Sequence, residues 1–211
     1  MRLPVVIVAM WITSTLAIVG HEKNVRWLEI AFKPLTTILL LAIIGVPETT
    51  FAKLITAGVV LSLAGDIALL GNSNRVFTIG LAAFLLAHVA YTIAFVGVAV
   101  WSPVVPAIAL VMVLASISLL RATWMGTAQI HGPTIAYAVV ITVMVVSAWA
   151  TIGGPLVLAP AAAIGSFLFY VSDASLAVNR FRHPIPHVSL LALGVYWIGQ
   201  LGIAIAASSA F

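Results

Sequence analysis

The chain has 211 residues, of which 64% are hydrophobic and only 7% are charged, and its formal net charge is +4. Soluble domains carry about 25% charged residues, so this composition indicates an integral membrane protein. The chain has no cysteine, which excludes disulfides, thiolate catalysis and cysteine-ligated metal.

Long apolar stretches, separated by short polar clusters, run through the whole chain. Many of them approach or exceed the roughly 20 residues that a helix needs to cross a bilayer, whereas barrel strands would alternate in polarity over about 10 residues. We therefore predict an all-α fold, a polytopic transmembrane bundle of about eight helices that forms a single transmembrane domain over residues 1–211. The expected spans are Leu3–Gly20, Leu28–Val46, Thr50–Leu70, Phe77–Val100, Pro103–Leu120, His131–Ile152, Pro155–Val178 and His187–Ala207.

Basic residues are unequally divided between the two sides of this bundle. One side has Arg2 and Lys53, and the other has Lys23, Arg26, Arg75, Arg121, Arg180 and Arg182. By the positive-inside rule the second side is cytoplasmic, in the cell (inner) membrane, and both termini are outside. The basic loops are expected to contact anionic membrane lipids, and nucleic acid is not expected as a partner because the polar surface is small. The pattern makes no prediction of the oligomeric state.

Three ionisable residues lie inside the expected spans: Lys33, Asp66 and Asp173. A charge in hydrocarbon costs a few kcal/mol, so such a residue normally faces a partner or a wet cavity and has a function. Each of the three is four or five residues from the cytoplasmic end of its expected span, which is a depth of roughly 7 Å. This common depth predicts one shared pocket near the cytoplasmic face.

Deeper polar side chains could extend that pocket into a cleft for a lipid chain. His88 and Tyr91 are one turn apart in the expected fourth helix, as are Tyr196 and Gln200 in the eighth, and Tyr137 lies in the sixth. Nothing in this set requires a metal ion or a cofactor.

The two aspartate segments also resemble each other. Each aspartate is followed six residues later by an asparagine, Asn72 or Asn179, and then by an arginine and a phenylalanine within five further residues. The offset corresponds to four spans, which is consistent with two parallel four-helix repeats. The alternative is the general similarity of apolar helices to one another.

Two carboxyl groups in a partly dry pocket can divide the work of acid and base, because one can stay protonated while the other is ionised. This division suits acid-catalysed cleavage of an ether or acetal-like bond through an oxocarbenium ion. The chain has no Gly-x-Ser-x-Gly motif, so ester hydrolysis by a serine triad is disfavoured. The sequence does not say which aspartate is the acid.

Several segments between about residue 30 and residue 202 form a recognisable series in chain order. They are Phe32–Thr37, Gly65–Asp66, Phe77–Phe84 with His88 and Tyr91, Ser172–Asp173, and Tyr196 with Gln200. Together they resemble the YhhN-like lysoplasmalogenase family of eight-helix membrane proteins. The resemblance implies hydrolysis of the vinyl ether bond of a lysoplasmalogen to a fatty aldehyde and glycerophosphoethanolamine or glycerophosphocholine.

The resemblance also implies site residues, to which the depth argument adds Tyr137. We expect Asp66 and Asp173 to be catalytic and a lysophospholipid substrate to be bound by Lys33, His88, Tyr91, Tyr137, Tyr196 and Gln200.

Two other classes of protein have similar features. A small-molecule or lipid transporter would also have intramembrane carboxylates, a lysine and an internal repeat, although its site is expected at the bilayer midplane. In a structural or assembly factor the aspartates would only hold neighbouring helices together.

Overall fold

The computed structural model describes residues 2–127 and 131–208 of the chain. Within these ranges it contains eight helices that are each long and apolar enough to cross a membrane, and no strand. They are α1 (Arg2–Glu22), α2 (Arg26–Ile44), α3 (Thr50–Ala68), α4 (Asn74–Val96), α5 (Val104–Thr123), α6 (His131–Trp149), α7 (Ala159–Phe181) and α8 (Val188–Ser208), with a short 3₁₀ turn η1 (Trp124–Thr127) after α5. The predicted all-α transmembrane bundle is confirmed.

The helix ends differ from the expected spans by a few residues, and local chemistry explains several of the shifts. Helix α4 begins at Asn74 because the side chain of Ser73 accepts a hydrogen bond from the backbone N–H of Val76, at 3.3 Å. Helix α2 stops at Ile44 because Gly45 takes a left-handed backbone conformation, with φ of 74°.

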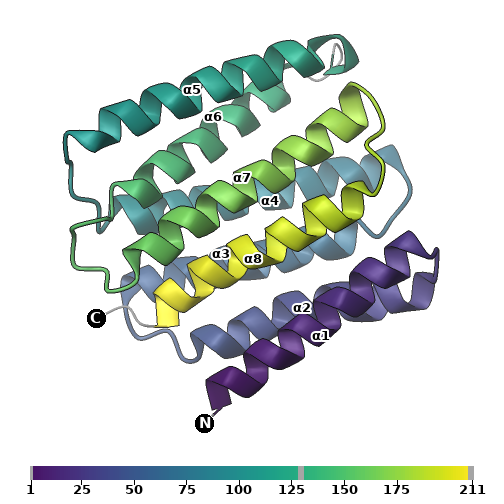
Figure 1. Ribbon diagram of the computed structural model, residues 1–211, viewed down its shortest axis with the longest axis horizontal. Helices are drawn as coiled ribbons and strands as arrows, with labels where there is room; N and C mark the ends of the chain where they lie inside the picture. Colours follow the sequence, from purple (N-terminus) through teal and green to yellow (C-terminus); the bar gives the residue numbers. More distant parts are fainter. Residues whose placement is uncertain (1, 128–130, 209–211) are drawn as a thin grey trace.

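The helices run back and forth, so both termini lie at one end of the bundle and four connections lie at the other (Figure 1). We call this second end the basic end, because it carries Lys23, Arg26, Arg75, Arg121, Arg180 and Arg182.

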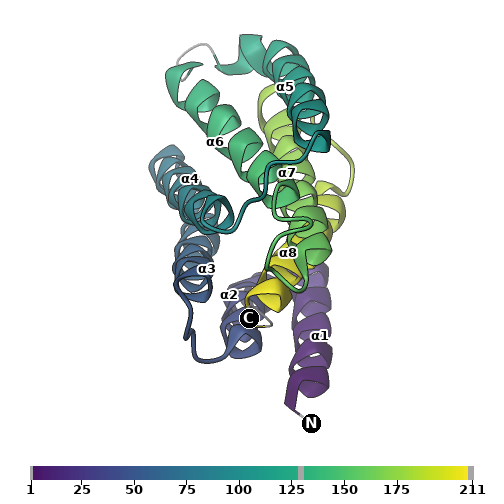
Figure 2. The same ribbon diagram turned by 90° about the vertical axis from the view of Figure 1, so that its left-hand side faces the viewer.

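Six helices form a closed ring in cross-section. Helix α2 packs on α3, α3 on α4, α4 on α6, α6 on α7, α7 on α8, and α8 returns to α2. Figure 2 shows the α3–α4 pair facing the α7–α8 pair across the middle of the bundle. Helices α1 and α5 lie outside the ring, α1 against α2 and α8, and α5 against α6 and α7. The inside of this ring is where charged side chains can be kept away from lipid.

Glycines let α7 and α8 approach each other closely. A Cβ atom at Gly199 would lie 2.6 Å from the carbonyl oxygen of Gly165, and one at Gly202 would lie 2.6 Å from that of Ala161. Small residues are typical of such contacts between membrane helices. The close approach fixes the part of the ring that carries Phe169, Asp173 and Tyr196.

Candidate active site

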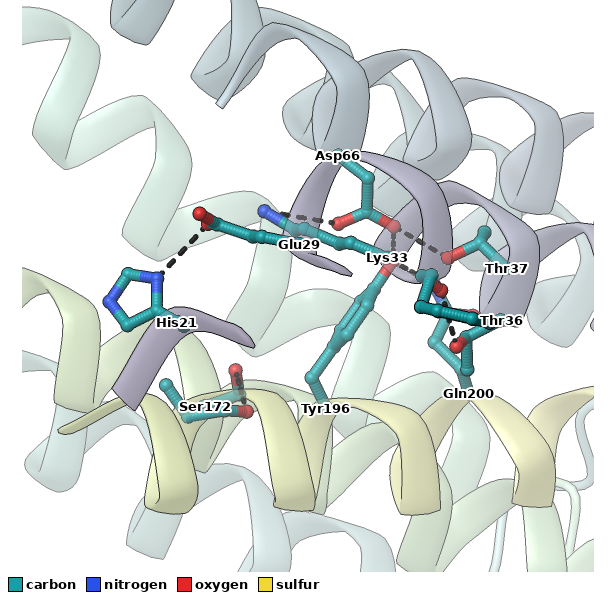
Figure 3. Close-up of polar contacts among 11 residues, drawn as sticks. His21, Glu29, Lys33, Thr36, Thr37, Asp66, Ser172, Tyr196 and Gln200 are labelled. Carbon is teal, nitrogen blue, oxygen red and sulfur yellow. Dashed lines mark hydrogen bonds and ion pairs between the residues drawn. The ribbon is translucent and has the colours of Figure 1, made fainter. Parts of the chain in front are cut away.

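Asp66, on α3, is only 1% exposed and is surrounded by partners from other helices. Its Oδ1 lies 3.8 Å from Nζ of Lys33, and its Oδ2 accepts hydrogen bonds from Oγ1 of Thr37 (2.6 Å) and from the hydroxyl of Tyr196 (2.9 Å) (Figure 3). Lys33 and Thr37 are one turn apart on α2, so both reach the same carboxyl group. A cation and two hydroxyl donors are the kind of environment that a buried carboxylate requires.

A second layer of hydrogen bonds ties this carboxyl group to α4. Gln200 donates from Nε2 to the Tyr196 hydroxyl at 3.4 Å, and the hydroxyl of Tyr91 donates to Oε1 of Gln200 at 2.8 Å. All three side chains are buried. The orientation of Tyr196, and with it that of Asp66, therefore depends on a chain of contacts that crosses the ring.

Asp173, on α7, has different partners. The hydroxyl of Tyr137 donates to its Oδ2 at 2.5 Å, and Nε2 of His88 lies 3.6 Å from the same oxygen. The Asp173 side chain is 15% exposed, whereas that of Asp66 is 2% exposed. Within the described part of the chain, Asp173 forms no ion pair with a lysine or arginine.

His88 is completely buried, and neither of its ring nitrogens has a hydrogen-bond partner among the described residues. A buried imidazole without such a partner is costly.

The ring of Phe169 joins the two clusters. Its centroid lies 4.6 Å from that of His88 and 5.1 Å from that of Tyr196, and it is completely buried. Phe84 adds edge-on contacts to Phe169 at 6.1 Å and to Tyr196 at 5.9 Å. The two carboxyl groups thus belong to one aromatic interior, to which all six helices of the ring contribute.

The structure brings all eight predicted site residues into these two clusters, but the depth count that suggested a common layer was wrong in detail. Helix α3 ends at Ala68, two residues after Asp66, whereas α7 continues to Phe181, eight residues after Asp173. The helices protrude unequally at the basic end, so a distance counted from a helix end does not measure a common level. The lysine also pairs with one aspartate and is not shared by both.

Sequence reasoning missed two residues of the site. Thr37 follows Lys33 by four residues and Phe169 precedes Asp173 by four, so each shares a helix face with a residue that was identified. That spacing was the available signal. Among the described residues, no group of three or more histidine, aspartate or glutamate side chains is arranged to hold a metal ion.

Comparison with known proteins agrees with this architecture. The chain is 29% identical to lysoplasmalogenase TMEM86B of Homo sapiens over 189 residues, which are 88% of this chain and 78% of that protein. It is 27% identical to membrane protein YhhN of Escherichia coli O157:H7 over 199 residues, or 92% of this chain and 93% of that protein. It is also 28% identical to lysoplasmalogenase TMEM86A of Homo sapiens over 164 residues, or 74% of this chain and 65% of that protein. No solved structure is significantly similar to it.

The eight apolar helices and the membrane-protein relatives establish a multi-pass integral membrane protein. The model of the YhhN family matches residues 28–207, a range that includes every residue of the two clusters. The resemblance seen in the sequence is confirmed, and the chain belongs to the YhhN family.

Proposed function

We propose that this protein is a lysoplasmalogenase, a membrane-embedded hydrolase that cleaves the vinyl ether bond of a lysoplasmalogen. The products are a fatty aldehyde and glycerophosphoethanolamine or glycerophosphocholine. The names of two of its relatives support this substrate. The observation that carries the proposal is the pair of carboxyl groups, Asp66 and Asp173, which have unequal partners around one aromatic interior.

The reaction needs one acid, one base and one water molecule. The acid protonates the vinyl carbon that is not bonded to oxygen. The electrons of the double bond form the new C–H bond, and the neighbouring carbon, which is bonded to oxygen, becomes part of an oxocarbenium ion. Water adds to that carbon as the base takes its proton, which gives a hemiacetal. The hemiacetal then collapses to the aldehyde and the glycerol hydroxyl, so that one water is consumed and no net proton is gained or lost.

The partners of the two aspartates suggest their roles. Asp173 acts as the acid: Tyr137 holds its Oδ2, which leaves Oδ1 to carry the proton, and its side chain is the more exposed of the two. Asp66 is the ionised partner, because an ammonium group and two hydroxyl donors favour a carboxylate. It stabilises the oxocarbenium ion and orients the water.

The remaining residues position these groups and bind the lipid. Tyr91, Gln200 and Tyr196 fix the orientation of Asp66 through their hydrogen bonds. Lys33 adds a point charge for the phosphate next to the carboxylate. His88 lies beside Oδ2 of the acid, the oxygen that Tyr137 also holds, and helps to position that carboxyl group.

The site fits an enzyme better than a transporter. Its two carboxyl groups have unequal partners, which suits a division into acid and base, whereas a transport site requires no such division. By the positive-inside rule the basic end faces the cytoplasm and the termini face outward, with the protein in the cell (inner) membrane.

The test uses protein purified in detergent with two substrates, a lysoplasmalogen and its saturated alkyl-ether analogue. Only the vinyl ether should be cleaved, because the saturated ether has no carbon that can accept the proton. Cleavage of neither lipid, or equal cleavage of both, contradicts the proposal. Transport of intact lipid across proteoliposome membranes without any cleavage would also contradict it.

The variants Asp66→Asn and Asp173→Asn should each lower the cleavage rate at least ~100-fold. Glu48→Gln is the control, since Glu48 is exposed in the α2–α3 connection at the opposite end of the bundle, and this variant should cleave at the wild-type rate. Thermal unfolding of each variant separates loss of chemistry from loss of the fold.

A further inference from the structure

A polar cavity lies at the basic end, between α1, α2 and α3 and outside the aromatic interior. Its volume is about 310 Å³. It is lined by His21, Asn24, Arg26, Glu29, Leu69 and Asn72. Five of these six side chains, all except Leu69, are polar or charged and at least partly exposed, which suits an ionic group of a ligand.

The cavity combines opposite charges in a fixed arrangement. The carboxylate of Glu29, 12% exposed, lies 3.0 Å from Nδ1 of His21 and 3.1 Å from Nη1 of Arg26. Arg26 also donates from Nη2 to the carbonyl oxygen of Leu70. A guanidinium group has five N–H donors, so these two contacts leave it capable of binding a phosphate.

The mixture of charges favours a zwitterionic ligand over a simple anion. A free phosphate would meet the guanidinium of Arg26 but would be repelled by the carboxylate of Glu29. A phosphate that carries a positive amine suits both groups, since Arg26 would then share its charge between the phosphate and Glu29, and the amine would add a positive charge beside the carboxylate. Phosphocholine and phosphoethanolamine have this chemistry.

The cavity also lies close to the carboxyl group of Asp66. Glu29 precedes Lys33 by four residues on α2, and Leu69 follows Asp66 by three on α3, so the cavity is about one helical turn, or roughly 5 Å, beyond the ion pair. Figure 3 shows Glu29, Lys33 and Asp66 in one row. In a lysophospholipid the phosphate is separated from the ether oxygen by the three carbons of glycerol, a span comparable with one helical turn.

We propose that this cavity binds the head group of the substrate, with Arg26 on the phosphate and Glu29 on the positively charged amine. The inference rests on the proposed function for the identity of the lipid and its head group, and it adds which side chains contact that head group and distinguish it from a phosphate alone. The phosphate then lies between Arg26 and Lys33, which is the cation that the proposed function already assigns to it and which pairs with Asp66.

The experiment measures binding of two saturated alkyl-ether lysolipids, which cannot be cleaved by the proposed reaction. One carries phosphocholine and the other carries phosphate alone, and each displaces a fluorescent lysolipid from the purified protein. The wild type should bind the phosphocholine lipid about tenfold more tightly, which corresponds to about 1.4 kcal/mol. Inorganic phosphate and glycerophosphocholine are tested as competitors in the same assay.

Glu29→Gln should remove this preference, mainly by weakening the binding of the phosphocholine lipid. Glu29→Asp, which keeps the charge, should retain most of the preference. Arg26→Gln should weaken both lipids about tenfold, because both carry a phosphate. The controls are Glu48→Gln and Arg75→Gln; Arg75 is exposed at the same end of the bundle but does not line the cavity. A ratio measured within one variant does not depend on the fraction of protein that is folded.

The inference is wrong if the wild type binds both lipids equally, or if Glu29→Gln weakens both to the same extent, as expected if Glu29 only fixes the turn between α1 and α2. It is also wrong if inorganic phosphate competes as well as the phosphocholine lipid, which would indicate a site for free phosphate. Failure of the proposed function looks different: a protein that prefers the phosphocholine lipid but leaves a lysoplasmalogen intact would bind lysolipid without cleaving it.

Discussion

Replacing Gly199 by alanine tests whether the close approach of α7 and α8 positions the candidate site. The new Cβ would lie 2.6 Å from the carbonyl oxygen of Gly165 and 2.9 Å from the backbone nitrogen of Phe169, whereas ordinary contact begins at 3.4 Å. The two helices would have to separate by about 0.8 Å at this point, which is an overpacking that typically costs about 1–3 kcal/mol. Because Phe169 lies on the displaced segment, its ring would move relative to His88.

A displacement of this size is expected to lower the rate of vinyl ether cleavage about 100-fold and the melting temperature in detergent by several degrees. The matched control is Gly194→Ala on the same helix, where a Cβ would meet no atom within 4 Å. That variant should keep full activity and gain up to about 1 kcal/mol, because alanine favours a helix over glycine. If Gly199→Ala melts and cleaves like the wild type, the glycine contact does not hold the site in place.

Three further variants test individual contacts. Lys33→Met should lower cleavage at least ~10-fold, because it leaves a buried carboxyl group without its cation, whereas Lys53→Met, at an exposed position near the opposite end of α3, should have no effect on the measured rate. Tyr137→Phe should slow cleavage about tenfold without a comparable loss of thermal stability, since it removes one hydrogen bond to the proposed acid. Phe169→Ala should destabilise the protein by about 3–5 kcal/mol in thermal or denaturant unfolding, and Phe167→Ala, with a side chain 41% exposed on the outside of the bundle, should not. If Lys33→Met and Lys53→Met have equal effects, or if Phe169→Ala and Phe167→Ala do, the corresponding contact does not have the expected role.

Hydropathy was sufficient to predict the number and order of the membrane-spanning helices, since every expected span overlaps one of them. It was less informative about their ends, which depend on single residues and not on average polarity. Thr49 and Ser73 cap α3 and α4 through side-chain oxygens, and Gly45 ends α2 through its backbone conformation. Helix α5 continues to Thr123 and the 3₁₀ turn to Thr127, beyond the expected end at Leu120.

The candidate site was predicted from the cost of burying polar groups, and this reasoning has a clear limit. Burial cost identifies residues such as Asp66 that need partners, but it says nothing about how each helix is rotated or which helices are neighbours. The pairing of Asp66 with Tyr196, 130 residues later, depends on α8 returning to α2 and α3. Phe169 carries no charge and stands in an apolar run, so its role between the clusters became visible only from the packing.

The two aspartates occupy equivalent places in the ring, as two parallel four-helix repeats would require. Each takes partners from the helix before its own, which is α2 for Asp66 and α6 for Asp173, and from the last helix of the other half, which supplies Tyr196 from α8 or His88 from α4. A parallel four-helix repeat would produce this exchange of partners, because two such repeats facing each other each complete the site of the other. The first half then places a lysine and a threonine beside its carboxyl group where the second half places a tyrosine. Differences at these few positions would be enough to divide an originally symmetric pair into an acid and a base.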